Sequence, residues 1–198
     1  MKIRNFDCTE MIKKFDYGEF SRVINLLEKN KLRYFIIGGF AIDAINSEER
    51  EHEDLDMIIN AEDKNILIEV FKQRSYISRK VGRIINLDKK TEDMYYNIDI
   101  LLMKEFGDFY RIRGNLTETK ISKNAFAEDN YVNFEEANFK IMPYEFFSSY
   151  KDIPHFNELK REPYQRAMSK IIPLCKKIEI LEMRQVKRLK CDPKYKPE

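Results

Sequence analysis

The sequence predicts an α+β (α/β-like) fold, in which helices flank a mixed β-sheet and a mainly helical C-terminal part follows. Helical and strand-like patterns alternate along the first half of the chain. Several strand-like runs then follow one another, and helical patterns return from Tyr144. At 198 residues the chain has room for one domain and a small appendage. We therefore expect one domain over 1–143 and a helical extension with a basic tail over 144–198.

The first half is expected to alternate helices with strands. A turn over 16–18 leads into a helix with apolar residues at helical spacing, namely Phe20, Val23, Ile24 and Leu27. The runs 33–37 and 55–59 favour strands, and a helix begins between them near residue 40. Asp63 can start another helix, whose apolar face would hold Ile66, Leu67, Val70 and Phe71.

Strand-like runs dominate the middle of the chain, at 76–87, 94–103 and 109–113. A polar turn over 88–93 makes the first two runs a hairpin or close neighbours. A last strand over 139–142 ends before a proline.

The C-terminal part is expected to be helical. Pro163 fits the first turn of a helix, and Pro173 must end or kink that helix. The segment 178–183 is expected to continue as helix, and the residues 187–198, which include two prolines and five Lys or Arg, to form a solvated tail.

Composition and charge limit the classes of protein to which the chain can belong. The 36 Lys and Arg and 34 Asp and Glu give a net charge of +2, without the basic excess of a general nucleic-acid binder. No apolar run approaches the roughly 20 residues that span a bilayer, and no signal-like segment opens the chain. Cys8, Cys175 and Cys191 lack metal-type spacing and are expected to be reduced thiols. These features predict a cytoplasmic globular protein that can still bind one nucleotide.

Gly38 and Gly39 come at the end of an expected strand and at the start of an expected helix. Two glycines allow a tight turn and leave backbone amides accessible, and a helix N-terminus favours phosphate groups. The same pair also fits an ordinary turn.

A dense acidic segment follows, since six of the nine residues from Glu48 to Asp56 are acidic. Strand alternation puts Asp54 and Asp56 on one face, about 6–7 Å apart, and Leu55 on the other. Such like charges repel each other unless a cation lies between them, and Mg²⁺ prefers hard oxygen ligands. The alternative is a solvated acidic strand end.

Asp99 lies between Ile98 and Ile100 in an apolar strand-like run. Because burying an unpaired charge is unfavourable, Asp99 either faces solvent from an edge strand or acts as a ligand or base. Together with the glycine pair, Asp54 and Asp56, it predicts a nucleotide–metal site. There the glycines would hold phosphates, two aspartates would hold metal ions, and the third would complete the ligand set or accept a proton.

These motifs resemble those of polymerase-beta-type nucleotidyltransferases. The segments Gly38-Gly39-Phe40-Ala41-Ile42-Asp43 and Arg50-Glu51-His52-Glu53-Asp54-Leu55-Asp56 are most similar to those of the aminoglycoside 2''-nucleotidyltransferases and lincosamide nucleotidyltransferases. Asp99 stands where that family places its third aspartate. The sequence departs from the pattern at Phe40, where Trp is usual, and at Glu49, where Thr or Gln is frequent.

The resemblance implies a nucleotidyltransferase fold and transfer of a nucleoside monophosphate from an NTP, such as ATP, to a hydroxyl of a small antibiotic-like acceptor. Mg²⁺, as two ions, would assist the transfer, and pyrophosphate would leave. The catalytic and metal-binding residues would be Asp54, Asp56 and Asp99, with Asp99 as the general base. Gly38 and Gly39 would face the triphosphate.

Further nucleotide-binding residues are expected to be Arg50, His52 and Lys151. A guanidinium group fits phosphate oxygens, which makes Arg50 a phosphate contact, whereas His52 either supports the start of the strand or takes part in catalysis. Asp43 is expected to cap or orient the loop. A further aromatic set either lines an acceptor pocket or belongs to the core: Tyr95, Tyr96 and Phe109.

Two other functions stay open. One is a toxin-like nucleotidyltransferase of the same fold that modifies RNA or protein. The other is a nucleotide-binding module without turnover. No membrane partner is expected.

Overall fold

The computed structural model describes residues 12–115, 117–126, 130–149, 158–171, 173 and 180–185. Three of the predicted features lie outside these residues: Lys151, the basic tail expected over 187–198, and the three cysteines Cys8, Cys175 and Cys191. None of the described helices is long and apolar enough to cross a membrane.

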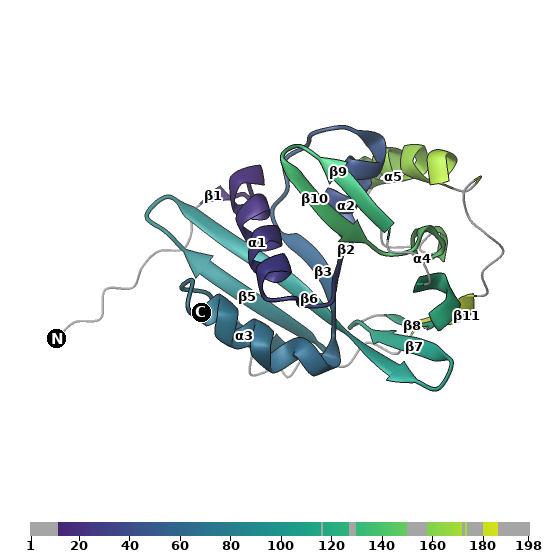
Figure 1. Cartoon of the computed structure of the whole chain (residues 1–198). Helices are drawn as coiled ribbons and strands as arrows, with labels where there is room; N and C mark the ends of the chain where they lie inside the picture. The colour runs from purple at the N-terminus through teal and green to yellow at the C-terminus, as the bar shows by residue number, and fades with distance from the viewer. Residues whose placement is uncertain are drawn as a thin grey trace.

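Five α-helices and two short 3-10 helices lie in the described part of the chain (Figure 1). Their bounds are α1 (Tyr17–Lys29), α2 (Gly38–Asn46), η1 (Ala61–Asp63), α3 (Lys64–Lys72), η2 (Lys123–Phe126), α4 (Tyr144–Ser149) and α5 (Glu158–Ile171).

The described strands join in one mixed sheet of eleven. They are β1 (Ile12–Lys13), β2 (Tyr34–Ile36), β3 (Leu55–Asn60), β4 (Ile77–Val81), β5 (Ile84–Lys90), β6 (Met94–Phe106), β7 (Phe109–Arg113), β8 (Thr117–Ser122), β9 (Asn130–Phe134), β10 (Ala137–Ile141) and β11 (Ile180–Gln185). The main path runs β11-β8-β7-β6-β3-β2-β10-β9, while β1 and β5 also pair with β6, and β4 pairs with β5.

The long strand β6 organises the sheet. β3 runs parallel to it along one edge, whereas β5 and β7 pair antiparallel with successive parts of its other edge. On the far side of β3, the antiparallel strand β2 leads directly into α2. Residues of β3, β5 and β6 are thereby brought side by side, although they are distant in sequence.

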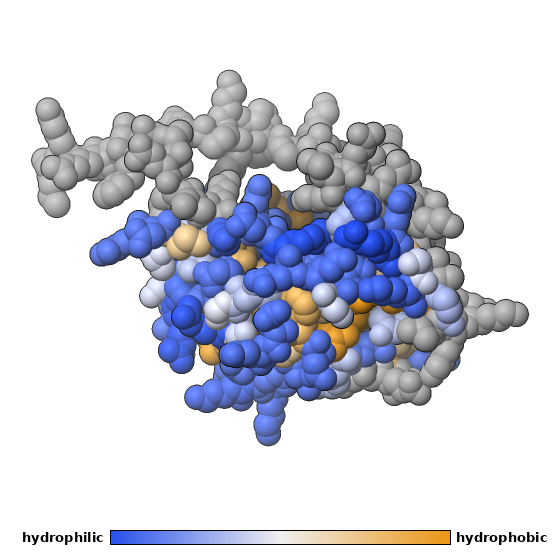
Figure 2. All heavy atoms as spheres, turned by 90° about the horizontal axis from the view of Figure 1, so that it is seen from above, coloured by the Kyte–Doolittle hydropathy of each residue, from blue (hydrophilic) through white to orange (hydrophobic). Residues whose placement is uncertain are grey.

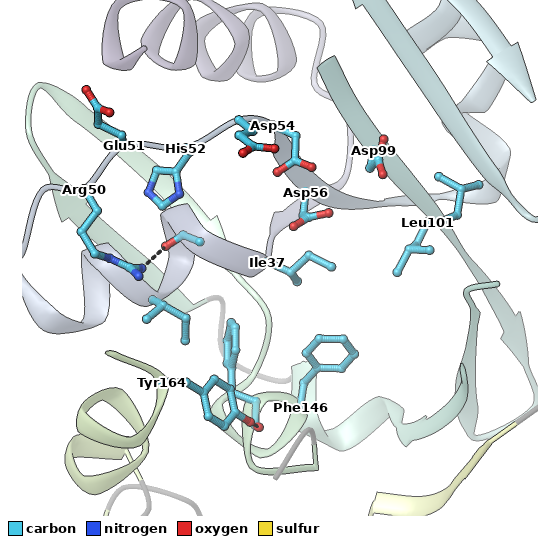
Figure 3. Close-up of a pocket in the computed structure, with 16 residues that line it drawn as sticks. Ile37, Arg50, Glu51, His52, Asp54, Asp56, Asp99, Leu101, Phe146 and Tyr164 are labelled. Atoms are coloured by element: carbon cyan, nitrogen blue, oxygen red, sulfur yellow. Dashed lines mark hydrogen bonds between the residues drawn. The ribbon is translucent and has the colours of Figure 1, made fainter. Parts of the chain in front are cut away.

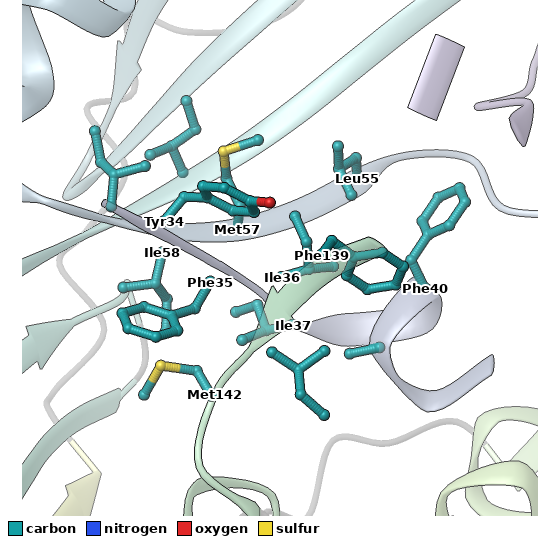
Figure 4. Close-up of a cluster of buried hydrophobic side chains, with 14 of the residues drawn as sticks. Tyr34, Phe35, Ile36, Ile37, Phe40, Leu55, Met57, Ile58, Phe139 and Met142 are labelled. Carbon is teal, nitrogen blue, oxygen red and sulfur yellow. The ribbon is translucent and has the colours of Figure 1, made fainter. Parts of the chain in front are cut away.

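The part of the core that supports the start of α2 lies where α2, β2, β3 and β10 meet (Figure 4). Tyr34 and Ile36 of β2 and Met57 of β3 are fully buried, and Phe40 of α2 stacks on Phe20 with ring centroids 4.5 Å apart. This packing holds the start of α2 rigidly beside the end of β2. Viewed from above, the described surface is mainly hydrophilic around a limited hydrophobic area (Figure 2).

Most of the predicted elements are confirmed, with three local corrections in the first half. The helix begins at Tyr17 instead of after a turn, because the Asp16 carboxylate caps it by accepting the amide of Glu19 at 2.8 Å. The run 76–87 is two strands joined at Gly82, whose φ of +63° suits a tight hairpin. Ile66 is 53% exposed and does not belong to the buried face of α3.

The structure of the C-terminal part departs further from the sequence prediction. Pro163 lies inside α5 and not in its first turn, and the Asn46 side-chain amide donates to its carbonyl at 2.9 Å. Residues 180–185 form β11 instead of a helix, because they pair antiparallel with β8. An edge strand offers unpaired N–H and C=O groups, and such non-local pairing overrides local propensity. The helical extension therefore contains a strand, while the division at residue 143 stays a prediction.

Candidate active site

A cavity of about 450 Å³, here called the acidic cavity, lies between the sheet and the helices α2, α4 and α5. Asp54, Asp56 and Asp99 lie along one side of it (Figure 3), and two further carboxylates, Glu51 and Glu53, also belong to its lining. The other walls are largely apolar and aromatic, with Ile37, Ile42, Ile84, Leu101, Phe146, Phe147 and Tyr164. Gly38, Gly39, Arg50 and His52 complete the lining. All the described residues that were predicted for the site thus meet in one cavity.

Asp56 and Asp99 are direct neighbours in the sheet. They are register partners in the parallel pair β3–β6, so their side chains leave the same face. Leu55 and Met57, on the opposite face of β3, are fully buried, as alternation predicts. Asp54 precedes β3, lines the cavity and is exposed.

Asp99 lies in an environment that disfavours its charged form. Burial and then the negative charge of Asp54 raise the pKa of Asp99 to about 6. The side-chain amide of Asn86, across the β5–β6 ladder, donates a hydrogen bond to Asp99 and opposes this shift. A carboxyl group with such a pKa can exchange a proton near neutral pH, as a general base must.

Asn86 is a site residue that sequence reasoning missed. It interrupts the apolar run from Ile84 to Leu87, which is the same kind of signal that drew attention to Asp99. Its Oδ1 atom is buried and has no hydrogen-bond partner among the described residues. Only the register of β5 against β6 reveals that Asn86 extends the row formed by Asp56 and Asp99.

The two glycines are required by close approaches of side chains. Gly38 has a φ of +65°, and a Cβ atom there would lie 2.2 Å from Oδ2 of Asp56. A Cβ atom on Gly39 would lie 2.4 Å from Nδ1 of His52. The turn therefore lies directly against the carboxylate row, and it also begins α2, whose N-terminal amides favour anions.

The loop before β3 is anchored on Asp43, which is fully buried in α2. Its Oδ2 atom lies 2.8 Å from Nε2 of His52, and its carboxylate also accepts hydrogen bonds from Arg50. The His52 ring packs on Phe40 with centroids 4.4 Å apart. This arrangement favours the supporting role for His52 and agrees with the expectation that Asp43 orients the loop.

Tyr95, Tyr96 and Phe109, for which the sequence left an acceptor pocket or the core open, do not line the acidic cavity. The hydroxyl of Tyr95 donates to Asp88, that of Tyr96 donates to Asp16 at 3.0 Å, and Phe109 stacks on Phe106. Tyr96 is a core residue, the alternative that the sequence left open. The aromatic wall instead comes from Phe146 and Phe147 of α4 and Tyr164 of α5, which sequence reasoning missed.

The donor set suits a hard divalent cation. The three predicted aspartates line one cavity, and repulsion from Asp54 contributes to the raised pKa of Asp99, which a cation would relieve. Within the described residues, no three His, Cys, Asp or Glu side chains already stand in a metal-holding arrangement. The residues thus have the chemistry for Mg²⁺ without a preassembled three-ligand cluster.

Residues 19–138 match the protein-family model that describes aminoglycoside-2''-adenylyltransferase, and this match decides the family. The chain belongs to this family. The matched range contains the glycine pair, Asp54, Asp56 and Asp99. Membership in an adenylyltransferase family confirms the predicted enzyme class, a nucleotidyltransferase.

Solved structures confirm the fold of this adenylyltransferase family member. The lincomycin-bound crystal structure of the lincosamide antibiotic adenylyltransferase LnuA has a TM-score of 0.61 and 16% identity, covering 79% of this chain and 98% of that chain. The crystal structure of ANT(2'')-Ia in complex with adenylyl-2''-tobramycin has a TM-score of 0.56 and 14% identity, covering 80% of this chain and 88% of that chain. No curated protein matches the chain by sequence.

Proposed function

We propose that the chain transfers the nucleoside monophosphate of an NTP, with ATP as the first candidate, to a hydroxyl of a small antibiotic-like acceptor. The observation that carries this proposal is the pairing of Asp56 with Asp99 in one cavity, directly against the Gly38 turn. Family membership and the antibiotics named in the structures of LnuA and ANT(2'')-Ia support the class of acceptor.

In the proposed reaction, Asp99 accepts the proton of the acceptor hydroxyl, whose oxygen then bonds to the α-phosphorus as pyrophosphate leaves. Asp54, Asp56 and Asp99 would hold Mg²⁺, two ions in our proposal, which neutralises phosphate charge and activates the reacting oxygens. Gly38 and Gly39 would present backbone amides to the triphosphate, and Arg50 would contact its oxygens. The apolar and aromatic walls would exclude water from the reacting groups.

The test is an assay of pyrophosphate release from ATP and Mg²⁺, with panels of aminoglycosides and lincosamides as acceptors. We expect an acceptor whose mass increases by one AMP. Asp54→Asn, Asp56→Asn and Asp99→Asn should each lower turnover at least about 1,000-fold, because each removes charge from the reacting centre. Glu118→Gln, in a buried carboxylate that pairs with Arg113 outside the cavity, should retain activity.

Other outcomes would redirect the proposal. Undiminished turnover in all three asparagine variants would refute the site assignment. A labelled RNA or protein, with no modified small acceptor, would favour the toxin-like alternative. ATP binding without pyrophosphate release across both panels would favour a binding module.

A further inference from the structure

The side chain of Asp43, in α2, forms hydrogen bonds with residues of α1 and of the loop before β3. Its side chain is fully buried, yet it is absent from the lining of the acidic cavity. Its carboxylate lies 3.2 Å from the hydroxyl of Tyr17, 3.0 Å from the backbone nitrogen of Arg50 and 2.8 Å from Nε2 of His52. The Nε atom of Arg50 donates to it as well. One carboxylate thus collects donors from α1 and from two positions of the loop.

The charge of Asp43 is compensated by these donors. Burial acts to raise the pKa of Asp43, but the hydrogen bonds from His52 and Arg50 outweigh it and hold the pKa below its ordinary value. A buried carboxylate is tolerated only when it is paired and hydrogen-bonded, so removing its charge or its partner changes the whole arrangement.

The loop from residue 47 to 54 has other attachments, including exposed ion pairs of Glu48 with Arg166 and of Glu51 with Lys14. The amide of Glu48 donates to the Asp43 carbonyl at 3.1 Å, and the carbonyl of His52 accepts the amide of Phe15 at 2.7 Å. The Asp43 carboxylate differs from these exposed pairs because it is fully buried. Arg50 donates to this carboxylate twice, once from its backbone nitrogen and once from its side chain.

This hold determines where the Arg50 guanidinium lies. With Nε on Asp43, its Nη2 atom lies 3.4 Å from the carbonyl of Gly39, beside the turn that would receive phosphates (Figure 3). The Arg50 side chain remains 30% exposed and lines the acidic cavity, so part of its donor fork is accessible to a ligand. An arginine without this anchor would sample many rotamers.

We propose that Asp43 is a positioning residue for nucleotide binding, which acts by holding Arg50 in a phosphate-binding orientation at the glycine turn. This inference rests on the proposed function and extends it, because it assigns a role to a carboxylate that contacts no substrate. It requires that the contribution of Asp43 to nucleotide affinity depend on Arg50.

A double-mutant cycle tests this dependence. The probe is an ATP analogue with a methylene bridge between the α- and β-phosphorus atoms, which cannot react, in the presence of Mg²⁺, and calorimetry gives Kd. Asp43→Asn and Arg50→Met should each raise Kd about tenfold, as expected for a lost charge-assisted hydrogen bond. The double variant should bind no more than about twofold more weakly than Arg50→Met alone. Glu118→Gln, which changes a buried carboxylate paired with Arg113, is the matched control and should bind like the wild type.

Arg50→Lys tests the same point without altering the buried carboxylate, should Asp43→Asn not fold. Lysine keeps the positive charge but lacks the fork that Asp43 holds, so Kd should rise as in Arg50→Met. Wild-type affinity in Arg50→Lys, or losses that multiply to about 100-fold in the double variant, would overturn the positioning role alone. Failure of the wild type to bind the analogue would instead overturn the proposed function together with this inference.

Discussion

Gly38 occupies a position that a residue with a side chain cannot fill without strain. Its φ of +65° lies in the left-handed region, and a Cβ atom would also collide with the Asp56 carboxylate. Gly107 has a similar φ of +52°, but a Cβ atom there would meet nothing within 4 Å. Substitutions at Gly107 therefore test backbone strain alone, whereas substitutions at Gly38 test strain together with the collision.

We expect Gly107→Ala to lower the free energy of unfolding by about 1–2 kcal/mol, from backbone strain alone, and to leave activity intact. Gly38→Ala should be less stable than Gly107→Ala and should lose about 100-fold in turnover, because displacing Asp56 misplaces a reacting group. Urea unfolding and the pyrophosphate assay measure both effects. Equal activity of the two variants would show that the approach to Asp56 is dispensable.

At the scale of elements, α2 connects the glycine turn to the C-terminal helix α5. Asn46, which is 5% exposed at the end of α2, donates to the Pro163 carbonyl at 2.9 Å. The ammonium group of Lys170 donates to the Asn46 carbonyl, also at 2.9 Å. Since α5 carries Tyr164, these bonds help to place the aromatic wall of the acidic cavity.

Asn46→Ala should lower the free energy of unfolding by about 1–2 kcal/mol, because it leaves the Pro163 carbonyl without its donor. Asn25→Ala, in an exposed residue of α1, is the control and should change stability by less than about 0.5 kcal/mol. Urea denaturation of both variants provides the comparison. If they lose the same stability, the bond to Pro163 contributes nothing measurable.

At the scale of the whole molecule, the acidic cavity makes folding of the metal-free protein dependent on pH. The pKa of Asp99 is about 6 in the folded protein, above the ordinary value of 3.8 for an aspartate. The folded state therefore binds more protons between these values, and the contribution of Asp99 to stability is lost as pH rises through about 6.

Asp99→Asn abolishes this loss. Its stability relative to the wild type should increase by roughly 1–2 kcal/mol between about pH 4 and pH 7.5, after allowance for the residual solvent exposure of Asp99. Urea unfolding of both proteins in EDTA at each pH measures the difference in their free energies of unfolding. Groups that titrate alike in the two proteins do not contribute to the change of this difference with pH. A difference between the two proteins that does not vary with pH would contradict the raised pKa.

The site residues that the sequence identified carry local signals. Gly38 and Gly39 stand between a strand and a helix, Asp54 and Asp56 follow strand alternation, and Asp99 interrupts an apolar run. Each of these signals depends on a few neighbouring residues, because backbone preferences and side-chain alternation act over short distances. The roles of these residues in the reaction remain predictions.

By itself, the sequence determined the alternation of helices and strands through α3, the strand character of β5, β6 and β7, and the aspartates that the sheet brings into one cavity. It did not predict β8 or β9. Only the tertiary structure decided that Asn86 lies beside Asp99, that Phe146 and Tyr164 form the opposite wall, and that residues 180–185 extend the sheet as β11. These features come from contacts between segments far apart in the chain. Strand register, helix packing and edge pairing depend on the whole fold, so no local pattern encodes them.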